Sequence, residues 1–117
     1  MPLVMLSHLV NLLVAGMVAA LIFRAPRAAE AAYGPDTDAR RILGCLYGAI
    51  AAASGVAIAA QPLDPDLPAR IALVLFPLQI AYKVATAPAV GLRSPVVRAN
   101  LAISALHALS LAVLILA

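Results

Sequence analysis

Four long runs of apolar residues, separated by three polar segments, cover almost the whole chain. Their approximate bounds are residues 3–23, 42–60, 71–91 and 96–117. A helix needs about 20 predominantly apolar residues to cross the hydrocarbon core of a bilayer, and each run meets that length. The separating segments carry prolines, glycines and charges, which end helices and do not lie in lipid. The pattern predicts an all-α integral membrane protein: four transmembrane helices in an antiparallel bundle with short loops.

The composition agrees with this prediction. Hydrophobic residues make up 65% of the 117 residues and charged residues 11%, against roughly 45–50% and 25% in soluble domains. Four spans leave little chain for anything else, so we expect one transmembrane domain over residues 1–117. The first run lacks the basic start of a signal peptide, and we expect it to be retained as the first helix.

Arginines gather in two of the three polar segments. The first and third segments carry six, namely Arg24, Arg27, Arg40, Arg41, Arg93 and Arg98. The middle segment carries only Arg70, beside Asp64 and Asp66. The positive-inside rule then makes loops 24–41 and 92–96 cytoplasmic and puts both termini outside, in the periplasm of a Gram-negative cell.

Basic residues at membrane ends also explain the net charge of +3, so we do not expect nucleic-acid binding. The sequence is rich in alanine and arginine and poor in lysine, which is typical of a GC-rich bacterium. We therefore expect the protein in a bacterial inner (plasma) membrane.

Polar side chains recur at helical spacing in the third and fourth runs. Each set shares one stripe of its helix: Gln79, Tyr82, Lys83 and Thr86, then Asn100, Ser104 and His107. A short turn joins these helices, so the stripes should face each other in a hairpin and form an intramembrane polar cluster. The first run adds Ser7, His8 and Asn11 at adjoining positions.

Lys83 is the only charged residue well inside a predicted span, about eight residues, or ~12 Å, from the cytoplasmic helix end. All five acidic residues lie in loops. One interpretation is a lysine that reaches toward the headgroups and is capped by Asn100 and Ser104. The other is that an anion from outside the chain neutralises it: a lipid phosphate, a ligand or an acid of another subunit.

The two histidines are candidate ligands for a cofactor that the sequence does not identify. His8 and His107 lie on different helices at depths that differ by ~7 Å at the helical rise, so they are poorly placed to hold one haem iron between them. Either alone could ligate a pigment or haem, or hydrogen-bond a quinone. The alternative is an ordinary interhelical hydrogen bond.

Small residues form a stripe on the second run. Gly44, Gly48, Ala52 and Gly55 repeat at three- and four-residue spacing, which lets another helix approach closely. The stripe serves either packing inside the bundle or an interface with a partner. The single cysteine, Cys45, excludes an intrachain disulfide, and we expect it to be a small core residue.

No sequence motif indicates catalysis: there is no nucleophile–base–acid set, HExxH, paired cysteines or phosphate loop. We expect a non-catalytic protein that acts by helix–helix association, as an accessory or assembly subunit of a larger membrane complex or as a homo-oligomer. Its partners would be the lipid bilayer and other transmembrane subunits or itself. One alternative is a small oligomeric transporter with a polar path lined by Gln79, Lys83, Asn100 and His107. A third is a cofactor- or pigment-binding subunit of an electron-transfer or photosynthetic complex.

Overall fold

The computed structural model describes all 117 residues, and every regular element in it is helical. Three consecutive segments form the first long helix: α1 (Pro2–Val10), the π-helical turn η1 (Asn11–Ala15) and α2 (Gly16–Arg24). The others are α4 (Asp38–Ala60), α5 (Leu67–Val90) and α6 (Pro95–Leu116). All four are long and apolar enough to cross a membrane.

The long helices begin a few residues before some of the predicted apolar runs because local signals start them there. The Thr37 side chain accepts a hydrogen bond from the Arg40 amide and caps α4, and Asp38 in the first turn suits the positive helix end. In α5 and α6 a proline occupies the first turn. The N–H groups of a first turn have no partner within the helix, so a proline there costs no helical hydrogen bond. These start signals therefore place the helix ends before the predicted apolar runs.

The first polar segment, predicted to be a loop, contains the short helix α3 (Pro26–Tyr33). Pro26 follows the end of α2 at Arg24, in keeping with its effect as a helix breaker, but it also stands at the start of α3, where proline is favoured. The alanines that follow have high helix propensity. The helix ends at Gly34, whose φ of 84° is in the left-handed region that favours glycine.

A buried arginine fastens α3 to the start of α4. The Arg40 side chain, 3% exposed, donates from Nη1 to the carbonyls of Pro26, at 3.1 Å, and Gly34, at 3.0 Å. These carbonyls belong to the two ends of α3. The neighbouring Arg41 is exposed and donates two hydrogen bonds of 3.0 Å to the Asp36 carboxylate. This contact holds the pKa of the Asp36 carboxyl below its usual value.

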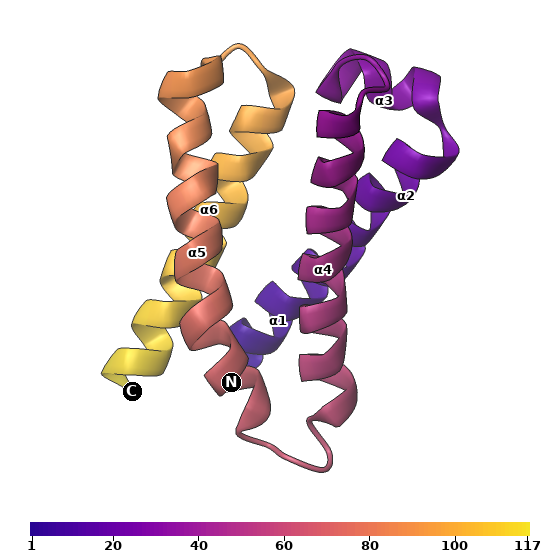
Figure 1. Ribbon diagram of the computed structural model, residues 1–117. Coiled ribbons are helices and arrows are strands. Elements are labelled where there is room, and N and C mark those ends of the chain that lie inside the picture. The colour runs from indigo at the N-terminus through magenta and orange to yellow at the C-terminus, as the bar shows by residue number, and fades with distance from the viewer.

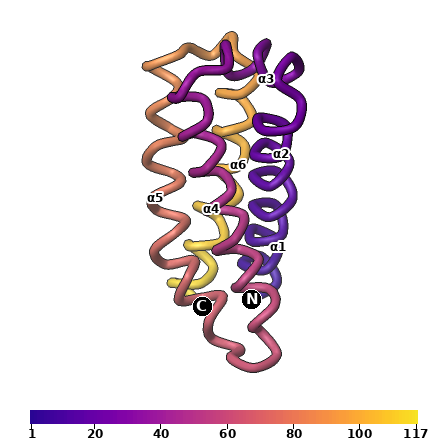
Figure 2. The backbone as a smooth tube through the Cα atoms, turned by 45° about the vertical axis from the view of Figure 1, so that its right-hand side comes forward, coloured from indigo at the N-terminus to yellow at the C-terminus, as the bar shows by residue number.

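The chain reverses direction at each of its three connections, as Figure 1 shows. Helix α5 packs against α6, and α2 with η1 packs against α4, while α1 contacts α4, α5 and α6. Figure 2 shows the tubes side by side, with both termini toward the end that carries the α4–α5 connection. Helix α3 and the α5–α6 turn lie at the opposite end.

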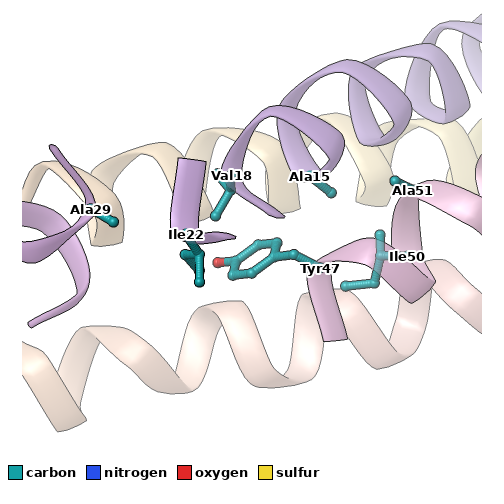
Figure 3. Packing of buried hydrophobic residues seen from close by; sticks show 7 residues of the cluster. All are labelled: Ala15, Val18, Ile22, Ala29, Tyr47, Ile50 and Ala51. Carbon is teal, nitrogen blue, oxygen red and sulfur yellow. The ribbon is translucent and has the colours of Figure 1, made fainter. Parts of the chain in front are cut away.

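The apolar core is small and lies mainly between the first long helix and α4. Seven buried residues form it (Figure 3): Ala15, Val18, Ile22, Ala29, Tyr47, Ile50 and Ala51. A second cluster joins Val4, Ala72 and Phe76 near the other end. Of the 25 buried residues, 11 are polar or charged, while many large apolar side chains are exposed. Soluble proteins bury a smaller share of polar side chains, because theirs lie mostly at the surface.

The glycine stripe of α4 contacts the first long helix of the same chain. A Cβ atom on Gly44 would lie 2.9 Å from Cγ2 of Ile22, and one on Gly55 would lie 3.5 Å from Leu12. The contact at Gly48 is looser, because a Cβ atom there would lie 4.0 Å from Cβ of Ala19. Ala52 is exposed and lies off this contact.

The expectation for Cys45 was wrong, because its side chain is exposed. Its neighbour Gly44 faces the first long helix, and one residue further along, the helix has turned by about 100°, away from that contact. Small size alone therefore did not indicate burial.

Candidate functional site

A hydrogen-bonded network joins all four long helices through Asn11. Its amide nitrogen donates to Oε1 of Gln79 at 2.7 Å and to the Ser54 hydroxyl at 3.2 Å. Its amide oxygen accepts from Nε2 of Gln79, at 3.0 Å, and lies 3.0 Å from Nε2 of His107. Asn11 is 3% exposed and begins the π-helical turn, a local irregularity that is frequent at functional positions.

His8 extends this network toward the end where the termini lie. Its Nε2 atom is 2.9 Å from the Pro68 carbonyl, which only accepts, so Nε2 carries the proton. Nδ1 then accepts from the Ser54 hydroxyl at 3.1 Å. Beyond it, the hydroxyls of Ser7 and Ser110 are 2.7 Å apart, and Ser110 donates to the Leu3 carbonyl.

The two imidazoles both contact Phe76. His107 stacks on the Phe76 ring, with the ring centroids 4.3 Å apart and the ring planes at 7°. The centroid of the His8 ring lies 4.8 Å from that of Phe76, and these two ring planes are at 51°. Both nitrogens of His8 are engaged, whereas Nδ1 of His107 is buried without a hydrogen-bond partner. Of the two proposed ligands, only His107 therefore has a nitrogen available, and no group of three or more metal-binding side chains accompanies it.

Lys83 lies on α5 between two aromatic rings and an amide. Its Nζ donates to Oδ1 of Asn100 at 3.1 Å and lies 5.5 Å from the Tyr47 centroid and 5.1 Å from the Tyr82 centroid. Both rings are within the range of a cation–π interaction. The Asn100 amide nitrogen contacts Thr86 at 3.4 Å, and Thr86 donates back to the Lys83 carbonyl. The lysine side chain is 3% exposed.

Two adjoining cavities lie beside Lys83, at the end of the molecule that carries α3. The first, of about 240 Å³, is lined by Lys83 and by residues of the first long helix, α3, α4 and α6. The second, of about 200 Å³, is lined by Tyr82, Thr86 and residues of α3, α4 and α6. Both are lined by Tyr33, Tyr47, Val96 and Asn100. We call these two cavities together the Lys83 cleft.

The Lys83 cleft contains no carboxylate. The ion pairs of the chain are Arg40–Asp36, Arg41–Asp36 and Arg70–Asp64, all near the connections. An ammonium has three N–H donors, and Lys83 makes one hydrogen bond, to a neutral amide. The other two N–H donors of Lys83 have no hydrogen-bond acceptor within this chain.

The predicted polar cluster is divided between two places. Lys83, Thr86 and Asn100 meet across the α5–α6 hairpin, and Tyr82 joins them through its ring. Gln79 and His107 instead meet at Asn11 of the first long helix. The hydroxyls of Tyr82 and Ser104 are buried without a partner.

The sequence prediction overlooked Ser54 and Ser110, both fully buried. Ser110 follows His107 by three residues and so continues the stripe of α6, a signal that was available. The sequence offered less indication that Ser54 is buried in a polar network, because it is a single small hydroxyl residue among alanines and glycines.

The Lys83 cleft offers one lysine amine and neutral hydrogen-bonding groups. The one hydroxyl that donates to an imidazole, Ser54 beside His8, is fully buried and lines neither cavity of the cleft. Groups of this kind in the cleft can hold an anion by charge and by hydrogen bonds. Comparison with protein-family models, with curated proteins and with solved structures finds no match to this chain.

Proposed function

We propose that the chain is a multi-pass protein of a bacterial inner membrane, folded as an antiparallel bundle of four transmembrane helices. The distribution of side chains supports this. Large apolar residues such as Leu13, Val74 and Ile115 are exposed on the long helices, and the buried face of α6 consists largely of Asn100, Ser104, His107 and Ser110. A lipid solvent favours apolar side chains outside and polar ones inside.

The arginine distribution supports an orientation with α3 and the α5–α6 turn in the cytoplasm. Six arginines flank this end, against one at the other. The Lys83 cleft would then lie in the cytoplasmic half of the bilayer. Both termini would be periplasmic.

Within this membrane we propose that the protein works by association, without catalysis, as an accessory subunit or homo-oligomer that holds an anion carried by another membrane component. The observation behind this proposal is the burial of Lys83 beside an amide and two rings, with no acid of its own chain nearby. A lysine near the bilayer centre costs about 2.5–3.5 kcal/mol on insertion scales. An external anion would offset that cost.

The test replaces Lys83 by methionine, which keeps the length of the side chain and removes the charge. Native mass spectrometry after mild extraction should show that the wild-type protein carries a bound partner or ligand and that Lys83→Met loses it while keeping its yield and helix content. The control is Val84→Met, because Val84 is the next residue on α5 and its side chain faces outward, 46% exposed. It should retain the bound component.

An unchanged set of bound components in Lys83→Met would refute the proposed role of the lysine. Improved stability together with that result would instead support a lysine that only reaches for the headgroups.

A second candidate function, a small transporter, is favoured by one observation. Buried polar groups occur along much of the bundle. Beyond those around Lys83 lies the separate network of Asn11, Gln79 and His107, which extends to His8 and Ser54. In reconstituted liposomes, this function predicts anion flux that Lys83→Met abolishes without any loss of bound components. The association function predicts no flux in either protein.

A further inference from the structure

The Lys83 cleft is a slot between helices rather than a docking groove for another helix. An α-helix with its side chains is about 10–12 Å across. Helix α6 contacts α1 at the other end of the molecule but has no comparable packing against α2 beside the cleft. Cavities of about 240 and 200 Å³ are too small for such a helix. They are also far larger than the ~30 Å³ share of one water molecule.

The lining is mostly apolar, and its polar groups belong to Lys83, Thr86, Ser94, Asn100 and the tyrosines. Val14, Val18 and Ile103 line the first cavity, and Leu43 and Val90 the second. A small hydrophilic anion would leave these walls without contacts. The lining therefore suits a molecule with a charged group at one place and a hydrocarbon body next to it.

We propose that the Lys83 cleft binds one anionic phospholipid of the surrounding bilayer, with its phosphate at Lys83 and part of an acyl chain along the apolar walls. This inference rests on the proposed function, since it names the external anion. Lysine is a common phosphate-binding residue and acts there as a compact point charge.

Two residues that line the second cavity carry further donors. The buried Tyr82 hydroxyl has no hydrogen-bond partner, and its residue lines the second cavity. The Asn100 amide nitrogen makes only a long contact of 3.4 Å to Thr86. Phosphate oxygens accept hydrogen bonds from both kinds of group.

The position also suits a lipid headgroup. Lys83 is seven residues before the end of α5 at Val90, about 10 Å below it at the helical rise. Arg93 and Arg98 flank the α5–α6 turn above the cleft and are exposed. Basic side chains at a cytoplasmic membrane surface attract anionic lipids, which would raise their concentration near the cleft.

The experiment titrates delipidated protein in mild detergent with four probes that share oleoyl chains: phosphatidylglycerol, phosphatidylcholine, diacylglycerol and oleate. Native mass spectrometry should give a saturable 1:1 complex with phosphatidylglycerol and at least tenfold weaker binding of the other three. Lys83→Met should weaken phosphatidylglycerol binding at least tenfold, and Lys83→Arg should largely restore it. Val84→Met serves as the control on the outer face of the same helix.

A second variant tests the apolar walls without changing any charge. Val96 lines both cavities, so Val96→Trp should fill the cleft and also reduce phosphatidylglycerol binding at least tenfold. It keeps the inference testable if Lys83→Met does not fold.

Equal binding of phosphatidylglycerol and diacylglycerol would overturn the lipid site, and so would phosphatidylglycerol binding that both Lys83→Met and Val96→Trp leave unchanged. Either result would mean that the lipid attaches nonspecifically to the outer surface of the protein. If Lys83→Met instead releases a co-purifying protein while lipid binding stays the same, the lipid inference fails and the proposed association function stands. Loss of neither component would refute both.

Discussion

At the scale of single residues, Asn11 organises the buried polar groups. Its side chain takes part in four hydrogen bonds, to residues of α4, α5 and α6. A primary amide suits this position because it donates and accepts at once without carrying a charge into the low-dielectric interior. The network therefore joins four helices at little electrostatic cost, and Lys83 is not part of its hydrogen bonds.

Replacing Asn11 by leucine should destabilise the fold, because Gln79 and His107 would keep buried polar atoms without partners. We expect the free energy of unfolding to fall by about 1–3 kcal/mol, the usual cost of stranding such groups. Unfolding in mixed detergent micelles, followed by circular dichroism, measures it. Ser104→Ala is the control, since its buried hydroxyl has no partner to strand. Equal effects of both variants would contradict a central role of Asn11.

The sequence indicated which polar residues are buried better than it indicated which ones meet. Spacing along a helix shows that Gln79 and Lys83 share a face. It does not show that Asn11 of a distant helix comes between Gln79 and His107, because that depends on helix order and tilt. The absence of an acid near Lys83 was foreseeable, since all acids lie in loops.

At the scale of the elements, the helix α4 owes its close contact with the first long helix to missing side chains. Gly44 is the tight point, because Ile22 is buried and branched at Cβ and therefore has little freedom to move aside. Spacing alone suggested four equivalent small positions, but the structure distinguishes them. The crossing of the two helices brings Gly44 into contact and leaves Gly48 with space.

Gly44→Ala should therefore lower the free energy of unfolding by about 1–3 kcal/mol through overpacking against Ile22 and Phe23. Gly48→Ala, whose Cβ would meet nothing closer than 4.0 Å, should be neutral or stabilise α4 by up to about 1 kcal/mol through helix propensity. The same micelle unfolding assay compares them. A larger loss for Gly48→Ala than for Gly44→Ala would mean that α4 packs in a different register.

At the scale of the whole molecule, the two ends differ in charge and in the polar groups that they bury. The end with the termini holds the closed part of the network, around His8, Ser7 and Ser110. The opposite end holds α3, most of the arginines and the Lys83 cleft. A protein that meets an anionic headgroup in one leaflet needs this asymmetry, and it needs a fixed orientation to use it.

The most direct measurement of this orientation labels single cysteines in intact cells with a membrane-impermeant thiol reagent. In a Cys45→Ser background, Leu63→Cys places the thiol in the α4–α5 connection, where Leu63 is 90% exposed, and Ala28→Cys places it on the outer side of α3. We expect Leu63→Cys to react in intact cells and Ala28→Cys only after the inner membrane is opened. Labelling of Ala28→Cys alone in intact cells would invert the protein and turn the Lys83 cleft to the periplasm. Equal labelling of both variants would contradict a fixed four-span arrangement.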